Sequence, residues 1–216
     1  MSIQVTVDLV IFTVHERALK VLLVKRGVRP FKGRMEIPGA VIQENESLEQ
    51  AALRELKEET SANQVYLEQL YAFGDPRRNP RNRVVTVAYY ALIPGDQARR
   101  VSGNGWRSVD RLPPLAFDHR RIVNYALERL RNKLEYTTAG FQLLPRKFTL
   151  SELQTVYETI LGKKLDKRNF RKKMDLLGIL KPLREWRRTG RKPARLYIFA
   201  GKKFEKLKDK GILFPF

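Results

Sequence analysis

The sequence contains no cysteine and only two histidines among its 216 residues. Disulfide bonds and thiolate metal sites are therefore excluded, and nothing in the chain depends on an oxidising compartment. A basic leader followed by an apolar stretch is also missing, and no run approaches the roughly 20 apolar residues that a membrane-spanning helix needs. We therefore expect a soluble, cytoplasmic protein with no membrane partner.

Acidic residues are scarce, with 23 Asp and Glu against 43 Lys and Arg and a net charge of +20. Such an excess favours a polyanionic partner such as nucleic acid. The excess is uneven, because residues 146–216 hold 21 basic and 7 acidic residues (net +14), against 22 and 16 (net +6) in residues 1–145. This asymmetry predicts two domains, residues 1–145 and 146–216, with different roles.

The first domain reads as a mixture of buried strands and amphipathic helices. Ser47 followed by Gln50 forms a capping box, which predicts that a helix starts there. Alternating or continuous apolar runs predict strands, and a second helix is expected further on. The expected strands cover residues 5–14, 20–27 and 83–94, and the second helix covers residues 119–134.

The second domain reads as two helices followed by a hairpin. Thr149 with Glu152 forms another capping box, and Asp166 is a suitable N-cap for the next helix. Phe170 and Met174 lie at helical spacing on the side of that helix expected to face the core. The segments 183–188 and 194–199 then flank a basic turn as a β-hairpin.

Three carboxylates crowd together in the segment RELKEET, residues 54–60. On a helix, Glu55, Glu58 and Glu59 are related by three- and four-residue steps and project to one side. Such a cluster suits a hard cation that prefers oxygen ligands, above all Mg²⁺ with Mn²⁺ as an alternative. The plain alternative is a solvated helix face.

The stretch GAVIQENESLEQAALRELKEETS, residues 39–61, resembles the Nudix box. Glu46, Arg54 and the three carboxylates match its fixed spacing, whereas Ala40 and Ser61 replace its two glycines. The resemblance implies that Glu55, Glu58 and Glu59 are metal ligands and, in an active hydrolase, catalytic residues. It also implies that Arg54 and Glu46 brace the loop.

Residues 71–92 resemble the Nudix branch that handles ADP-ribose. The resemblance makes Tyr71 and Phe73 candidates for stacking on a base, and it makes arginines candidates for pairing with phosphates, namely Arg78, Arg81 and Arg83. The alternatives are a sheet core for the aromatics and a basic loop for the arginines. Asp118 and His119 offer either an acid–base group or the start of a helix.

The basic tail is predicted to bind double-stranded DNA. A helix with a cationic outer face fits the major groove, and a basic hairpin tip reaches neighbouring phosphates. Because the tail's aromatics, including Trp186, are expected to face the core, the pattern favours a duplex over a single strand. A charge run that only aids solubility is the alternative. The DNA-binding candidates are Lys167, Arg168, Asn169, Arg171, Lys172, Arg188, Arg191 and Lys192.

Taken with the Nudix box, residues 140–174 make the chain resemble the Nudix-related transcriptional regulators of NrtR type. This implies an α+β protein, in which a Nudix α/β/α sandwich precedes a winged helix-turn-helix domain. It further implies a homodimeric regulator, with repression the expected mode, that senses ADP-ribose or a related metabolite and binds a palindromic operator. Two alternatives stay open, a Mg²⁺-dependent ADP-ribose pyrophosphatase and an RNA-bound Nudix protein.

Overall fold

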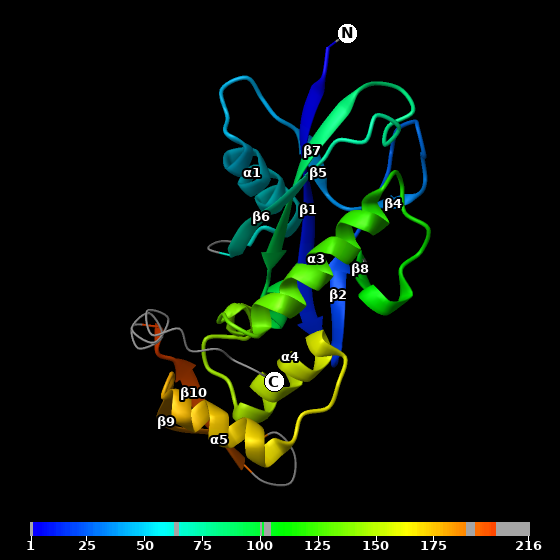
Figure 1. Cartoon of the computed structure of the whole chain (residues 1–216). Coiled ribbons are helices and arrows are strands. Elements are labelled where there is room, and N and C mark those ends of the chain that lie inside the picture. Colours follow the sequence, from blue (N-terminus) through cyan, green and yellow to red (C-terminus); the bar gives the residue numbers. More distant parts are fainter. Residues whose placement is uncertain (1, 63–64, 100, 102–104, 189–192, 202–216) are drawn as a thin grey trace. The chain divides into compact units, whose positions relative to one another are not determined.

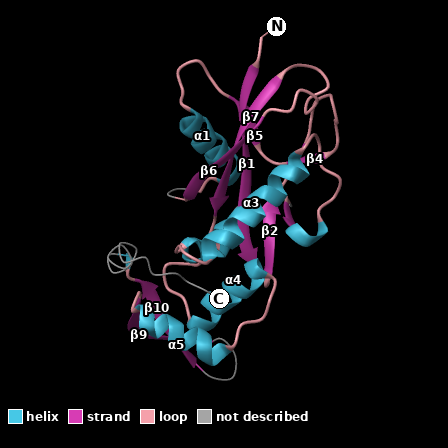
Figure 2. Ribbon diagram, viewed as in Figure 1, coloured by secondary structure: helices cyan, strands magenta, loops and turns pink. Residues whose placement is uncertain are grey.

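The computed structural model describes residues 2–62, 65–99, 101, 105–188 and 193–201. It divides into two compact units, residues 1–129 and 130–216. Figure 1 shows the helices and strands of both, and Figure 2 shows the same view by secondary structure. The domain boundary expected after residue 145 stays a prediction. In the described part of the chain, no helix is long and apolar enough to cross a membrane.

A six-stranded sheet forms the centre of the first unit. Its order is β6 (Tyr66–Phe73), β7 (Val84–Leu92), β1 (Gln4–His15), β2 (Ala18–Leu22) and β8 (Trp106–Ser108), and β5 (Gly39–Val41) pairs with β1 off this path. The long central strands β1 and β7 run parallel, with Asp8 opposite Ala88. A small second sheet joins β3 (Val24–Lys25) to β4 (Met35–Glu36).

Helix α1 (Leu48–Thr60) begins at the predicted capping box, in which the Ser47 side chain accepts from the Gln50 backbone. Its apolar stripe, Ala51, Ala52 and Leu56, packs with buried residues of β1 and β7.

Alternate residues of β1 point to the other face of the sheet. Helix α3 (His119–Leu134) lies on that face, where Arg129 binds Glu68. The predicted α/β/α sandwich is confirmed. Short helices complete the unit, α2 (Gly95–Ala98) and η1 (Val109–Arg111).

The second unit is a helix-turn-helix followed by a two-stranded hairpin. Helix α4 (Leu150–Leu161) carries the predicted capping box of Thr149 and Glu152 and ends at Gly162, whose φ of 69° is left-handed. Asp166 caps α5 (Lys167–Leu177) by accepting from the Asn169 backbone. Strands β9 (Leu180–Arg188) and β10 (Pro193–Phe199) pair antiparallel.

The core of the second unit lies between these elements, the short helix η2 (Ala139–Leu143) and the last turn of α3. Apolar side chains fill it, and removing their surface from water is the main force that holds the unit together. Its buried members include Leu130, Leu134, Phe141, Phe148, Leu153, Val156, Tyr157, Ile160, Phe170, Met174 and Leu196. The predicted winged helix-turn-helix architecture is confirmed.

Candidate functional site

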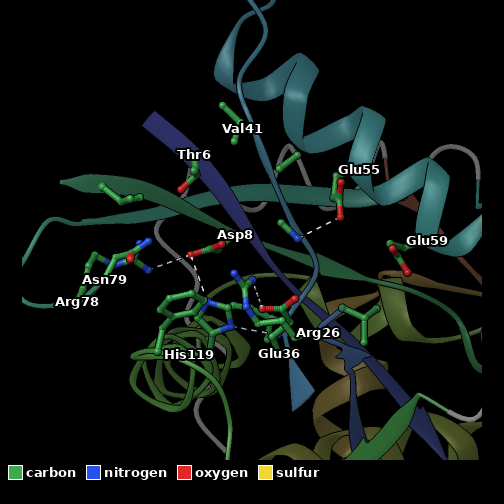
Figure 3. A pocket seen from close by; sticks show the side chains of 16 residues that line it. Thr6, Asp8, Arg26, Glu36, Val41, Glu55, Glu59, Arg78, Asn79 and His119 are labelled. Carbon is green, nitrogen blue, oxygen red and sulfur yellow. Dashed lines mark hydrogen bonds and ion pairs between the residues drawn. The ribbon is translucent and has the colours of Figure 1, made fainter. Parts of the chain in front are cut away.

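A cavity of about 360 Å³ opens in the first unit, between the start of β1 and helix α1 (Figure 3). Residues far apart in the sequence meet there, because the parallel β1 and β7 bring the loop before β7 beside the strand that starts the chain. The cavity is lined by Thr6, Asp8, Val24, Arg26, Glu36, Ile37, Gly39, Ala40, Val41, Glu55, Glu59, Arg78, Asn79, Val84, Phe117 and His119.

Helix α1 supplies two carboxylates to this cavity, from Glu55 and Glu59. Burial raises the pKa of the Glu55 carboxyl, and the negative charges of Glu59 and Glu58 raise it further. Burial, followed by repulsion from Glu58, also raises the pKa of Glu59. Burial and mutual repulsion thus disfavour the ionised form of both carboxyls, and a cation at this wall would stabilise it.

The backbone at Gly39 holds Glu55 in place. The Gly39 N–H donates to Glu55 Oε1 at 3.0 Å. A Cβ added at this position would lie 2.5 Å from Asp8 Oδ1 and 2.8 Å from the Val7 carbonyl, so only glycine fits so close to β1. The glycine that the site requires is therefore Gly39, one residue before Ala40.

The predicted brace between Arg54 and Glu46 is present. Arg54 donates to both Glu46 oxygens, at 2.6 and 3.1 Å. The same guanidinium lies 3.9 Å from Glu58, whose side chain is 61% exposed and does not line the cavity. Ser61, at the second altered glycine, caps α1 with a left-handed φ of 53°. Serine therefore adopts here the conformation that glycine takes most readily.

Arg78 lies at the wall opposite Glu55 and is held between two carboxylates. It donates to Asp118 Oδ1 at 2.8 Å and to Asp8 Oδ2 at 3.1 Å, and its side chain is only 6% exposed. Close by, Arg26 donates to Glu36 at 2.9 Å. Such buried pairs fix the guanidinium groups in position, because an unpaired charge would be costly there.

His119 is buried beside the same cluster. Its Nδ1 accepts the Ile37 N–H at 3.2 Å, so the ring proton lies on Nε2, which is 3.9 Å from Asp8. The Asp118 carboxylate accepts from Arg78. Figure 3 shows Asp8 with its pairs to Arg78 and His119. In this arrangement His119 ties the start of α3 to the segment before β5.

The charges of the lining residues determine whether the cavity can bind a divalent cation. Four carboxylates and two guanidinium groups face the cavity, so it carries a net negative charge. The described residues contain no group of three acidic or histidine side chains close enough to enclose a metal ion. Mg²⁺ is commonly held by one or two carboxylates together with water and substrate phosphates. Glu55 and Glu59 fit that mode, whereas Glu58 lies outside it.

The other predicted ligand residues lie away from the cavity. Arg81 donates to the Arg29 carbonyl and Arg83 to the Gly74 carbonyl, each at 2.8 Å or less. Tyr71, which is 56% exposed, packs edge-on against the buried Phe73. Of the five predicted ligand contacts, the structure therefore places only Arg78 in the cavity wall, and the roles of the other four stay predictions.

Three charged cavity residues were not singled out from the sequence, namely Asp8, Arg26 and Glu36. Asp8 left a signal, since it is the one acid inside the apolar run VTVDLVIFTV. A buried charge within a strand needs a partner of opposite charge or a hydrogen bond, so the position of Asp8 by itself indicates a functional site. The other two left no comparable signal, because a basic and an acidic residue near short strands are ordinary surface features.

The predicted DNA-binding residues of α5 are exposed, whereas Phe170 and Met174 of the same helix are buried. The exposed set comprises Lys167, Arg168, Asn169, Arg171 and Lys172. Arg188, at the end of β9, is exposed as well. Arg191 and Lys192, predicted at the hairpin tip, lie outside the described residues. The helix thus presents its cationic side to solvent, as a DNA-reading helix requires.

One expectation about the tail is wrong. Tyr157 and Phe170 are buried as predicted, but Trp186 is 62% exposed. The hairpin pairs Trp186 with Arg195, and strand alternation puts it on the opposite face from Arg187, which binds Glu152. The indole therefore lies on the side of β9 that faces away from α4.

Comparison with known proteins gives the same two parts. Residues 2–126 match the NUDIX domain family, and residues 140–199 match the family described as the NrtR DNA-binding winged helix domain. The chain is 36% identical to the ADPR responsive transcriptional repressor NtrR of Acinetobacter baylyi, over 97% of this chain and 85% of that protein.

Two solved structures of Shewanella oneidensis NrtR resemble the chain. The complex with a 27mer DNA is 38% identical, with a TM-score of 0.84 over 93% of this chain and 95% of that one. The NUDIX domain complexed with ADP ribose is 42% identical, with a TM-score of 0.54 over 60% of this chain and 90% of that one.

Proposed function

Because the chain belongs to the Nudix family, in its NrtR-type branch with a winged helix, we propose that it is an ADP-ribose-responsive transcriptional repressor. The first unit senses ADP-ribose or a related metabolite, and the second binds a palindromic operator. The repressor of A. baylyi is named for this response. The S. oneidensis protein has been crystallised with DNA, and its NUDIX domain with ADP ribose. A cytoplasmic location, where such an operator is reached, belongs to the same proposal.

The observation that carries the DNA-binding half is the two-sided character of α5. Phe170 and Met174 anchor the helix in the core, and the five predicted DNA-binding side chains of α5 face water. Arg and Lys read guanine in the major groove and Asn reads adenine, so Asn169 beside Arg168 supplies both kinds of contact. The remaining bases of the helix neutralise phosphates.

In the ligand-binding half, the cavity of the first unit receives a diphosphate. Arg78 and Arg26 pair with phosphate oxygens of the ligand. Each guanidinium group is already held in position by a carboxylate hydrogen bond. Glu55 and Glu59 hold Mg²⁺, or Mn²⁺ in its place. The ion, when bound, offsets the charge between these acids and the diphosphate. His119 and Asp8 keep the opposite wall in place.

Regulation follows from the geometry of a homodimer on DNA. Two recognition helices must match operator half-sites that lie one helical turn, or a multiple of it, apart. Ligand binding changes the relative position of the two protomers and so the separation of their recognition helices. A change of about a few ångströms weakens binding at both half-sites. A coupling of about 1–3 kcal/mol between ligand and operator is ordinary for such a switch.

A second candidate function is Mg²⁺-dependent hydrolysis of ADP-ribose. The observation that favours it is the retention of Glu55 and Glu59 at the cavity wall, in register with the Nudix box. A cation there would activate water for attack on the diphosphate. Replacing Glu59 by Gln is then expected to abolish turnover, and turnover that survives this change rules out its assigned role.

One experiment separates the two candidates. Operator DNA is titrated with the protein, with and without ADP-ribose, while product formation is followed in the same sample. A repressor binds the operator tightly, ADP-ribose changes this affinity, and no product forms. An enzyme with an ancillary tail shows product and no ligand-dependent shift. Failure to bind any duplex excludes the repressor.

A further inference from the structure

Asp118 lies immediately before α3, in the position of an N-cap residue. Its backbone carbonyl accepts from the Arg121 N–H at 2.8 Å and from the Ile122 N–H at 3.2 Å, and the second of these is the first hydrogen bond of the helix. An aspartate in this position ordinarily also binds a backbone N–H of the first turn through its carboxylate. Within the described residues, both hydrogen bonds of the Asp118 carboxylate come instead from Arg78, at 2.8 and 3.2 Å. The carboxylate therefore holds an arginine of the cavity wall and not the helix end.

The start of α3 has no negative charge of its own. Its first turn contains no acidic residue and two basic ones, Arg120 and Arg121, where the helix dipole favours a negative charge. In the described part of the chain, the Arg120 N–H donates to no protein group. Phe117, just before Asp118, holds a left-handed φ of 49°, which a residue with a side chain rarely adopts. The pair of Asp118 with Arg78 thus leaves the start of α3 in a less stable arrangement than a capped helix.

A ligand phosphate needs the same edge of Arg78 that Asp118 now occupies. Arg78 donates to Asp118 through Nε and Nη2, the edge with which a guanidinium binds either a carboxylate or a phosphate by two parallel hydrogen bonds. Arg78 lines the cavity and Asp118 does not, so a diphosphate in the cavity competes with Asp118 from the cavity side. Asp8 accepts from Nη2 at 3.1 Å and keeps the guanidinium in the wall when Asp118 leaves.

We propose that a diphosphate ligand takes Arg78 from Asp118, and that the released carboxylate then caps α3 by accepting from the Arg120 N–H. The inference rests on the proposed function for the identity of the ligand. It makes Asp118 a positioning residue, which acts through Arg78. Helix α3 ends at Leu134, which is buried in the core of the second unit. The exchange of partners therefore links occupancy of the cavity to a helix whose last turn belongs to the DNA-binding unit.

The variant Asp118→Asn tests the competition for Arg78. Asparagine removes the charge that holds the guanidinium but keeps an oxygen that caps a helix well. Calorimetric titration with ADP-ribose and Mg²⁺ should give a dissociation constant about fivefold lower than that of the parent, because the ligand no longer displaces a carboxylate. A pair with a merely structural role predicts the opposite sign, since its loss would disorder the wall. Asp118→Ser, which also caps without charge, replaces this variant if circular dichroism shows that it is unfolded.

Hydrogen–deuterium exchange follows the start of α3 directly. In the parent, ADP-ribose should slow exchange of the first-turn amides at least about threefold, and in Asp118→Asn exchange should already be slow without ligand. Asp8→Asn is the matched control, because it removes a charge from the same guanidinium and leaves the pair with Asp118 in place. A gain in ligand affinity from the lost charge alone appears in both variants, whereas slow exchange at α3 without ligand appears only in Asp118→Asn.

The outcomes separate this inference from the proposed function. Weaker ADP-ribose binding by Asp118→Asn, or parental exchange at α3 in that variant without ligand, overturns the change of partners and leaves the repressor intact. Exchange at α3 that ADP-ribose does not slow in the parent overturns it as well. If ADP-ribose slows this exchange but leaves the operator affinity of the parent unchanged, the repressor alone fails. A parent that binds no ADP-ribose overturns both.

Discussion

The basic residues around the Nudix site and those on the outer side of α5 differ in how they are paired. In the first unit, Arg26, Arg54 and Arg78 each bind a carboxylate at 3.1 Å or less. In the second unit, Arg168 and Lys172 are exposed on α5 and have no ion pair within the described residues. Arg26 and Arg78 line the cavity, Arg54 braces the loop before α1, and the unpaired basic residues of α5 form an exposed surface.

This difference shows how the same residue types serve two kinds of recognition. A small ligand must displace water from a preformed pocket, so the groups around it are fixed by one another. A DNA duplex is long and strongly charged, so exposed bases meet it with little preorganisation and release its counterions. Substitutions on either side test this contrast, from the largest expected effect to the smallest.

Removing the guanidinium of Arg78 should break the paired side of the contrast. Arg78→Ala leaves the buried Asp8 and the partly buried Asp118 without their cation, and breaking a buried pair costs about 3–5 kcal/mol. Urea unfolding at neutral pH measures the loss. The control is Arg77→Ala, because that neighbouring side chain is 92% exposed and should change stability very little. Similar losses in the two variants would show that the buried pairing is unimportant.

A divalent cation should bind to the acidic wall of the first unit. Mg²⁺ at about 100 times its dissociation constant stabilises a protein by about 2.7 kcal/mol, and differential scanning calorimetry detects this as a higher unfolding midpoint. Glu59→Gln removes one of the two cavity carboxylates and should abolish most of the increase. Glu49→Gln, which changes an exposed acid of the same helix, should retain it. An increase that survives in Glu59→Gln places the cation elsewhere.

Neutralising α5 should weaken the unpaired side. With Arg171 and Lys172 both replaced by Ala, operator affinity should fall at least about tenfold, and the salt dependence should become flatter by about 0.9 for each phosphate that is no longer neutralised. Fluorescence anisotropy across a range of salt concentrations measures both quantities. Arg77→Ala again serves as the control. An unchanged salt slope in the double variant would mean that α5 does not meet the phosphates.

The turn between α4 and α5 depends on one carboxylate. Glu158 accepts from the Leu165 N–H, Gln154 and Lys164, and these contacts, led by the backbone N–H, lower the pKa of Glu158 below its ordinary value of 4.5. Because the folded pKa is lowered, its stabilising effect is complete above pH 4.5 and is lost as pH falls through the lowered value.

Glu158→Gln is therefore expected to cost about 1 kcal/mol at pH 7 and progressively less in acid. Denaturant unfolding at several pH values measures this difference. The exposed Glu135, changed in the same way, is the control and should cost little stability at pH 7. A constant difference between parent and Glu158→Gln down to pH 2 would contradict the role of the charge.

The smallest effect is expected at Ser61. This residue holds a left-handed φ of 53° at the end of α1. Ser61→Gly relieves the strain but makes the unfolded chain more flexible, so the free energy of unfolding should rise by less than about 1 kcal/mol. Chemical denaturation is precise enough to detect it. A clear loss of stability would show that the serine hydroxyl has a role of its own.

Much of the site could be predicted from short-range patterns. The Nudix spacing placed Glu55 and Glu59 on one helix, and the brace of Arg54 with Glu46 was expected and is present. Arg78 was expected to meet ligand, and it lines the cavity. Its partners were not foreseen as a group, because Asp8 and Asp118 are separated from it by 70 and 40 residues.

The sequence by itself determined the helices and their ends, through capping residues and apolar spacing that act within a few turns. It also determined the excess of positive charge in the tail. Only the tertiary structure decided which side chains are paired and which are open, including the exposure of Trp186. The reason is physical: burial and ion pairing depend on neighbours that the strand register brings together from distant parts of the chain.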